Sequence, residues 1–252
     1  MKRILALVTL CLAGIVGSAQ AELPPDYKIF LQTENFPPYN FSIDGKNFAR
    51  GEKINGISVD IVKEMFKRAG IKYSLTLRFP WSRIYDMTLE RPNYGVFSMV
   101  RSSEREALFT WVGPLAPDEW VFLARNDSTI RLNSLADAKK YKVGGYRGDA
   151  IAEYLTDEGF DNLDLSFQDK FNAQKLTDGK IDLWASNNYS GLFLAKQEGV
   201  SGLRKIYTFD LVDLFLGLNP NTPKEAVDRL QSALDQMRSD GTIDRIISSY
   251  IQ

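Results

Sequence analysis

The chain contains no histidine and a single cysteine, Cys11. The absence of histidine excludes Ser-His-Asp and Cys-His nucleophilic sites, histidine general bases and ordinary zinc sites. Cys11 lies in an N-terminal apolar segment, so removal of that segment would leave no thiol, disulfide or thiolate ligand. Any catalysis would have to use carboxylates, lysine, tyrosine or serine, and we expect neither a metal nor a cofactor.

Long apolar runs are absent beyond the N-terminus. Two basic residues, 2–3, precede an apolar run at residues 4–16, which is too short to span a bilayer comfortably. Ala19-Gln20-Ala21 follows as a small-x-small cleavage site. These features predict a cleaved signal peptide over residues 1–21 and a soluble, periplasmic product. An uncleaved anchor is the alternative.

The chain also lacks a strong excess of charge of either sign. It has 31 Lys and Arg residues and 32 Asp and Glu residues. The first 21 residues carry two of the positive charges and no negative ones, so the mature chain would have a net charge of −3. This small, unclustered charge argues against a nucleic-acid-binding surface.

Apolar periodicity predicts alternating strands and helices. In the first part of the chain we expect strands at residues 28–33, 73–79 and 94–100, with helices at 58–69 and 80–89. In the second we expect strands at 120–124, 142–146, 163–167 and 181–185, with helices at 135–140, 148–158, 172–177 and 190–197. This alternation is typical of an α/β fold with a parallel sheet in each of two related lobes.

The C-terminal part is predicted to return to the first lobe. Residues 207–218 have an extended pattern, and Thr222-Pro223-Lys224-Glu225 is a strong helix start. The helix carries an apolar stripe of Val227, Leu230, Leu234 and Met237, and a last helix begins at Thr242. Because both helices need an apolar partner, we expect them to pack on the first unit.

This return would make the chain cross between the lobes twice. We expect the crossings near residues 115–121 and 204–208. The predicted organisation is a lobe of residues 22–118 and 205–252, and a second lobe of residues 119–204, joined by a two-strand hinge.

Arg105 occupies an unfavourable position for a cation. A capping signal, Ser103 followed by Glu106, predicts a short helix with Arg105 in its first turn. The helix dipole and the free N–H groups of that turn favour anions. A bound anion or an acidic side chain nearby would account for the arginine.

Several motifs extend over nearly all of the mature chain. A proline-bearing segment, residues 34–41, is expected to form a rigid extended loop that displays three aromatic side chains. The other motifs are Gly56-Ile57-Ser58-Val59-Asp60, Ser102-Ser103-Glu104-Arg105, Trp111-Val112-Gly113-Pro114, Val143-Gly144-Gly145 before Gly148, Gly179-Lys180-Ile181-Asp182 and Asp240-Gly241-Thr242-Ile243-Asp244. In order and spacing they resemble the bacterial extracellular solute-binding proteins of family 3, which are periplasmic polar amino-acid-binding proteins with the type II periplasmic-binding-protein fold.

The resemblance implies ligand-binding roles for residues of the first lobe. Arg105 matches the arginine that grips the solute's carboxylate in this family. Phe36 matches the aromatic lid and Tyr39 its neighbour, while Trp81 matches an aromatic wall. Ser98 matches a position whose backbone and hydroxyl contact the ligand. Core packing is the alternative for Tyr39 and Trp81, and a buried strand serine is the alternative for Ser98.

Three departures from the family pattern affect the predicted ligand. Val100 stands where the family usually has serine or threonine, Asp149 replaces a threonine that touches the carboxylate, and Asn187 replaces the aspartate that takes the ammonium group. Asp149 would also serve as a helix N-cap, and Glu34 is a possible replacement charge. We therefore expect a small, polar, acidic or zwitterionic ligand that is not a standard α-amino acid in the usual pose.

The function implied by the resemblance is solute binding and not catalysis. The protein would capture a carboxylate-bearing solute, an amino acid or a related compound, between its lobes and deliver it to an inner-membrane ABC transporter permease. We expect it to be a monomer. One alternative is a cofactor-free enzyme on the same fold, similar to the cyclohexadienyl dehydratases, in which Asp149, Glu34 and Arg105 would act. The other is a soluble ligand sensor.

Overall fold

The computed structural model describes residues 22–250. The predicted signal peptide therefore lies outside the described residues. Within residues 22–250, no helix is long and apolar enough to cross a membrane.

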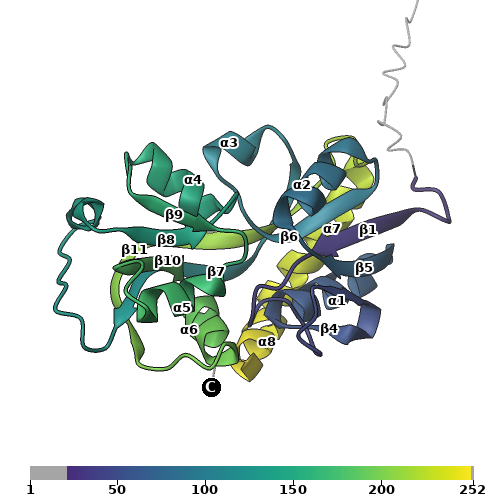
Figure 1. Ribbon diagram of the computed structural model, residues 1–252. Helices are drawn as coiled ribbons and strands as arrows, with labels where there is room; N and C mark the ends of the chain where they lie inside the picture. Colours follow the sequence, from purple (N-terminus) through teal and green to yellow (C-terminus); the bar gives the residue numbers. More distant parts are fainter. Residues whose placement is uncertain (1–21, 251–252) are drawn as a thin grey trace, which may run out of the picture.

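A nine-stranded sheet with helices on both sides runs through the molecule (Figure 1). The strands are β1 (Lys28–Thr33), β2 (Phe41–Ser42), β3 (Phe48–Arg50), β4 (Ile54–Asn55), β5 (Lys72–Arg78), β6 (Tyr94–Val100), β7 (Thr110–Arg125), β8 (Val143–Tyr146), β9 (Leu163–Ser166), β10 (Leu183–Asn187) and β11 (Leu203–Leu218). The order in the large sheet is β3-β5-β1-β6-β11-β7-β10-β8-β9, and β2 pairs separately with β4. The predicted α/β fold with two lobes is confirmed.

The helices follow the strands much as the sequence predicts. They are α1 (Ile57–Ala69), α2 (Trp81–Glu90), α3 (Ser103–Glu106), α4 (Ala150–Asp157), α5 (Phe171–Thr177), α6 (Asn188–Gln197), α7 (Lys224–Ser239) and α8 (Thr242–Tyr250), with 3-10 turns at Gly51–Lys53 and Ala136–Lys140. Val62, Met65 and Phe66 on the apolar side of α1 are fully buried, and the helix ends at Gly70, whose φ of 66° is left-handed.

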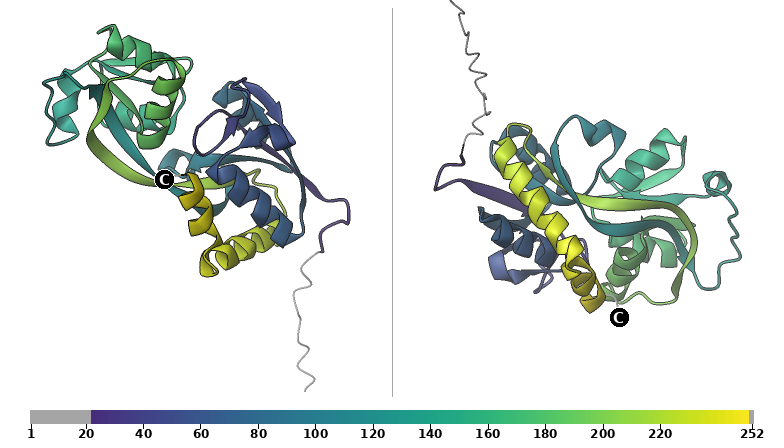
Figure 2. Two further views of the ribbon diagram at one scale, coloured as in Figure 1. Left: turned by 90° about the horizontal axis from the view of Figure 1, so that it is seen from below. Right: turned by 180° about the vertical axis from the view of Figure 1, so that it is seen from behind.

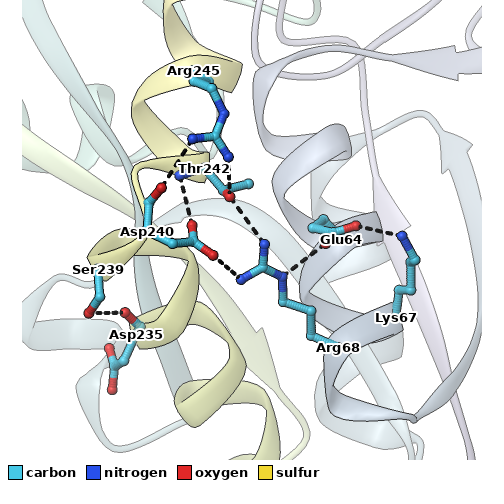
Figure 3. A network of polar contacts seen from close by, with 8 residues as sticks. All are labelled: Glu64, Lys67, Arg68, Asp235, Ser239, Asp240, Thr242 and Arg245. Carbon is cyan, nitrogen blue, oxygen red and sulfur yellow. Dashed lines mark hydrogen bonds and ion pairs between the residues drawn. The ribbon is translucent and has the colours of Figure 1, made fainter.

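The two C-terminal helices pack on the first half of the molecule, as predicted. Leu230, Leu234 and Met237 of α7 share one buried core with Met65 and Phe66 of α1. At the surface, Arg68 of α1 binds the junction between α7 and α8 (Figure 3). Its Nη1 lies 2.6 Å from Asp240 Oδ2, and its Nη2 lies 3.1 Å from Thr242 Oγ1. The end of the chain is thereby attached to the lobe in which the chain begins.

Two long antiparallel strands, β7 and β11, join the halves (Figure 2). Residues 214–218 of β11 pair with β6 of the first half, and residues 120–123 of β7 pair with β10 of the second. The first crossing lies in the predicted range 115–121. The second prediction is wrong in position, because residues 204–208 already pair with residues 121–124 of β7 beside β10. The crossing in β11 lies nearer Leu211–Asp213, which pair with residues 117–119.

Three local predictions are corrected by the structure. The N-cap of α3 is Ser102 and not Ser103, and Glu106 pairs with Arg101 instead of completing a capping box. Residues 36–40 form a tight turn and not an extended loop, because the Phe36 carbonyl accepts hydrogen bonds from the Tyr39 and Asn40 amides. The polar, glycine-containing sequence of residues 42–53 predicts an exposed loop, but this stretch contains β3, a short edge strand that pairs with β5.

Candidate functional site

A cavity of about 400 Å³ lies between the two halves. Its lining combines aromatic, polar and charged side chains from both, including Glu34, Phe36, Asn40, Trp81, Ser98, Arg105, Trp120, Tyr146, Asp149, Asp169, Asn187 and Ser190. Six of the seven predicted site residues line this cavity, and Tyr39 does not. The sheet places the cavity at the carboxyl ends of β1, β6, β8 and β10, where α/β folds usually bind ligands.

Arg105 is buried, with 3% of its surface exposed. Its guanidinium lies 5.5 Å from the ring centre of Tyr85 and 6.0 Å from that of Trp81, so aromatic faces cover the cation. Nη2 is 2.8 Å from Oε2 of Glu153, at the start of α4 in the other half. Of the two partners considered from the sequence, a bound anion or an acidic side chain, the acidic side chain is therefore present. A guanidinium has five N–H donors, so one ion pair leaves it able to bind an anion as well.

Ser98 has a left-handed backbone with φ of 61°. It is the extra residue in β6 where the pairing with β11 changes register, between Phe97 and Met99. A non-glycine residue held in this conformation is strained, and such residues gather at functional sites. The Ser98 hydroxyl is buried and has no hydrogen-bond partner among the described residues. The bulge thus places Ser98 in the lining of the cavity.

The turn of residues 36–40 contributes one aromatic side chain to the cavity and another to the core. Phe36 lines the cavity, while Tyr39 stacks behind it at 4.9 Å between ring centres and is 1% exposed. The Tyr39 hydroxyl lies 2.9 Å from the Pro117 carbonyl oxygen and 3.0 Å from Oδ1 of Asp118. The structure therefore gives Tyr39 the core-packing role, in contact with the β7 crossing.

The two altered positions of the second half both precede helices. Asp149 precedes α4, but its side chain makes no capping hydrogen bond. Asn187 precedes α6, and its Nδ2 donates to Oδ2 of Asp118. Asp118 also accepts hydrogen bonds from Tyr39 and from its neighbour's backbone amide, so both oxygens of the buried carboxylate are hydrogen-bonded. This network fixes the orientation of the Asn187 amide.

Asp169 and Tyr146 line the cavity but were not predicted from the sequence as site residues. Asp169 accepts hydrogen bonds from Trp184 Nε1 at 2.8 Å, Ser186 Oγ at 2.9 Å and Asn172 Nδ2 at 3.0 Å. Tyr146, at the end of β8, donates to Oε2 of Glu34 at 3.0 Å, so this bond joins the two halves. Their positions in the sequence could have indicated them, because ligands often bind at the carboxyl ends of parallel strands. Tyr146 ends the predicted strand 142–146, and Asp169 lies two residues after the predicted strand 163–167.

Burial raises the pKa values of the carboxyl groups near the cavity. The pKa of Glu34 rises to about 8, that of Asp118 to about 7 and that of Asp149 to about 6. In each case loss of hydration on burial is the main cause of the raised pKa. The hydrogen bond from Tyr146 partly lowers the pKa of Glu34, and the positive charge of Arg105 partly lowers that of Asp149. Within residues 22–250, no group of three or more acidic or cysteine side chains could hold a metal ion.

These raised pKa values predict that the ligand-free protein becomes less stable as the pH rises. The folded state holds the carboxyl protons more tightly than the unfolded chain, whose carboxyl groups titrate near about pH 4. The stability from Glu34 and Asp118 is thus full below about pH 4 and is lost towards about pH 8. Calorimetric scans should show Tm falling from about pH 5 to pH 8, and Glu34→Gln should reduce the slope near neutrality. A Tm that rises through this interval would contradict the assignment.

Comparisons with known proteins agree with the fold. The model of the bacterial extracellular solute-binding proteins, family 3, matches residues 29–252. No curated protein matches the chain.

Several solved structures share the fold at low sequence identity. A histidine kinase sensor domain with similarity to periplasmic binding proteins has a TM-score of 0.78 and 18% identity, over 88% of this chain and 95% of that chain. An ancestral arginine-binding protein bound to arginine has a TM-score of 0.75 and 21% identity, over 89% and 98%. The GluR0 ligand-binding core from Nostoc punctiforme, in complex with L-glutamate, has a TM-score of 0.72 and 18% identity, over 88% and 98%.

At these identities the solved structures show the fold alone. The family match rests on the sequence and extends from β1 to the end of the chain. The chain belongs to the bacterial extracellular solute-binding proteins, family 3.

Proposed function

We propose that the protein binds a small polar, carboxylate-bearing solute, an amino acid or a related compound, in the cavity between its halves. The supporting observation is Arg105, a buried guanidinium that lines the cavity, is covered by aromatic rings and keeps N–H donors beyond its bond to Glu153. Arginine is suited to a carboxylate because its planar fork can donate two parallel hydrogen bonds.

The protein would act as a periplasmic monomer that hands its solute to an inner-membrane ABC transporter permease. The two lobes would be those expected from the sequence, except that the boundary in β11 lies near Leu211–Asp213 and not at residue 205. The Arg105–Glu153 ion pair and the Tyr146–Glu34 hydrogen bond already connect the lobes. A solute that contacts both lobes would favour the closed state through its higher affinity for that state.

A cofactor-free lyase is the second candidate function. The observation that favours it is the pKa of Glu34, which burial raises to about 8, so that this carboxyl group can hold a proton at neutral pH. Glu34 would then be the acid and Arg105 the carboxylate-binding group. Turnover of prephenate or arogenate by the purified protein would establish this function.

Mass spectrometry of the native protein tests the binding function. We expect one small carboxylate-bearing molecule to co-purify, to be lost on unfolding, and to rebind reversibly after refolding, with calorimetry giving one site per chain. Release of the molecule unchanged would separate binding from turnover. A bound solute that lacks a carboxylate would contradict the role given to Arg105.

A further inference from the structure

A groove of about 660 Å³ lies on the first half of the molecule. Its floor is formed by residues of β1 and β5, and its sides by the end of α2 and the edge strand β3. Among residues 22–250, this groove and the cavity between the halves share no lining residue. The groove is therefore separate from the proposed solute site.

The register of the sheet places the floor residues side by side. Arg50 of β3 pairs with Thr76 of β5, and Thr76 pairs with Gln32 of β1. Because paired residues point to the same face of a sheet, these three side chains form one row. Ser74 lies two residues before Thr76 on the same face, and it pairs with Phe30. The floor thus combines hydroxyl, amide and aromatic groups.

The face that carries this row is covered on one side and open on the other. Val96 of β6 pairs with Gln32, and it is buried against Ile84 of α2. On the opposite side, Phe48 of β3 is 50% exposed, and Arg50 is also exposed. Solvent therefore reaches the groove from the β3 side.

Three arginines line the groove without an acidic partner. Within residues 22–250, Arg50, Arg78 and Arg91 form no ion pair. Lys63 also lines the groove, but its Nζ lies 3.0 Å from Oε2 of Glu52, so these two charges offset each other. Three positive charges therefore gather at one place in a chain whose formal net charge is −1.

Aromatic rings support the arginines without neutralising them. The Cζ atoms of Arg50 and Arg78 lie 5.2 and 5.7 Å from the centre of the Phe48 ring. The Cζ atom of Arg91 lies 5.6 Å from the centre of the Tyr94 ring. A ring face attracts a guanidinium, while the N–H donors at the edge of the guanidinium plane remain available to an anion. The two like charges beside one ring also repel each other, and an anion between them would relieve that repulsion.

Two buried polar atoms of the groove lack a hydrogen-bond partner among the described residues. They are Oε1 of Gln32, a residue that is 5% exposed, and Nε of Arg78. An unsatisfied buried polar group is costly unless a ligand supplies the partner. A side-chain amide can rotate to present either its oxygen or its N–H groups. Both side chains are therefore suited to a polar ligand.

We infer that the groove binds a small soluble anion that carries a phosphate group, with the three arginines around the phosphate and the Thr76 hydroxyl and Gln32 amide beneath it. A guanidinium can donate two parallel hydrogen bonds to a phosphate, and a phosphate near neutral pH carries up to two negative charges. Such a group matches three cations better than a single carboxylate does. The site goes beyond the proposed function, because it lies apart from the solute cavity.

The depth of the groove favours a small molecule over a membrane surface. Gln32, on the floor, is 5% exposed, whereas Phe48, at the edge, is 50% exposed. A small anion can contact both the arginines and the floor. The head groups of a lipid bilayer would contact the edge residues and leave the polar groups of the floor unsatisfied.

Titration of the intact, isotope-labelled protein with sodium phosphate, followed by NMR, tests the site. We expect saturable shifts in the backbone amide signals of residues 30–32 and 74–76, with a Kd of about 1–10 mM. Sodium chloride at the same ionic strength is the control, because general screening of charge affects both salts alike. Shifts at Ser98 and Arg105 instead would place the phosphate in the solute cavity and overturn the groove site. The absence of saturable shifts up to about 50 mM phosphate would also overturn it.

Variants locate the phosphate within the groove. Arg78→Ala is expected to raise the phosphate Kd about tenfold, because it removes a charge-assisted hydrogen bond. Thr76→Val removes one neutral donor at nearly constant shape, so we expect a smaller increase, of about threefold. Arg131→Ala is the matched control, because Arg131 is exposed in the second half and donates to the Ile130 carbonyl oxygen, and its loss should leave the Kd unchanged. Equal losses in the two arginine variants would attribute binding to overall charge and overturn the site.

Vesicles separate the small anion from a lipid head group. Co-sedimentation compares vesicles of phosphatidylglycerol with vesicles of phosphatidylcholine at the ionic strength of the titration. Saturable phosphate shifts without a preference for phosphatidylglycerol would support the inference. Binding to phosphatidylglycerol without saturable shifts from free phosphate would assign the arginines to a membrane surface and overturn the small-molecule site.

Discussion

Arg105→Ala is expected to weaken binding of the carboxylate-bearing solute by about 2–4 kcal/mol, or roughly 30- to 1,000-fold in Kd. The loss is large because the guanidinium is 3% exposed and contacts Tyr85 and Trp81, so little water can replace it. The substitution also leaves Glu153 without its partner across the cavity. Calorimetry with the solute released from the native protein measures the change in affinity.

Two further substitutions show which property of Arg105 matters. Arg105→Lys keeps the positive charge and loses the planar fork, so an intermediate loss is expected. Arg101→Ala removes a half-exposed arginine that pairs with Glu106 outside the cavity, and it should bind the solute as the unmodified protein does. Circular dichroism establishes that each variant is folded. Unchanged affinity in a folded Arg105→Ala protein would exclude the residue from the site.

The elements that the sequence predicts best are those with a one-sided apolar pattern. The helix α1 was expected at residues 58–69 and is observed at Ile57–Ala69. The C-terminal helices pack with their apolar faces on the first half of the molecule, as expected. The edge strand β3 was missed because Phe48 and Arg50 remain exposed, so it has no apolar face to detect. Burial of one face requires a periodic pattern of apolar residues, whereas backbone hydrogen bonding at a sheet edge requires no particular side chains.

The strand β7 was predicted at less than half its length because prolines interrupt its pattern. Pro114 and Pro117 lie inside the strand, where proline usually ends a sheet. They are tolerated because residues 120–123 alone pair with β10, so the earlier part of β7 is bonded to β11 on one side and lacks a second partner strand. The same asymmetry allows this segment to cross between the lobes.

The site was predicted unevenly for a related reason. Arg105 was singled out by its place in a predicted helix start, and the resemblance to the family then assigned it to the site. Asp169 and the Tyr146–Glu34 contact depend on how two distant segments meet, and no local pattern carries that information. The expectation of an acidic or zwitterionic solute came from Arg105 and from the departures at Asp149 and Asn187.

The turn that positions Phe36 depends on a close approach between backbones at Gly56. The amides of Ile57 and Ser58, at the start of α1, donate to the carbonyl oxygens of Pro38 and Tyr39 at 3.0 and 2.9 Å. Gly56 has a left-handed φ of 133°, and a Cβ there would lie 2.6 Å from the Tyr39 carbonyl carbon and 2.7 Å from the Pro38 oxygen. Glycine is required both by the conformation and by the space.

Gly56→Ala is therefore expected to destabilise the protein by about 3–5 kcal/mol, from backbone strain, overpacking and two weakened hydrogen bonds. The obstructing atoms are main-chain carbonyl groups, which cannot move aside as a flexible side chain can. To relieve the clash, the turn of residues 36–40 must move away from the start of α1. Phe36 should then leave the cavity, and the affinity for the solute should also fall. Urea unfolding measures the stability, and calorimetry measures the affinity.

Gly199→Ala is the matched control, because Gly199 also has a left-handed φ, of 71°, but no atom would lie within 4 Å of the added methyl group. It carries the conformational cost of alanine without the clash, so we expect a loss of about 1 kcal/mol and normal solute affinity. The difference between the two variants isolates the contact between Gly56 and the turn. Equal losses of stability in both would show that the turn does not rest on α1 at this point.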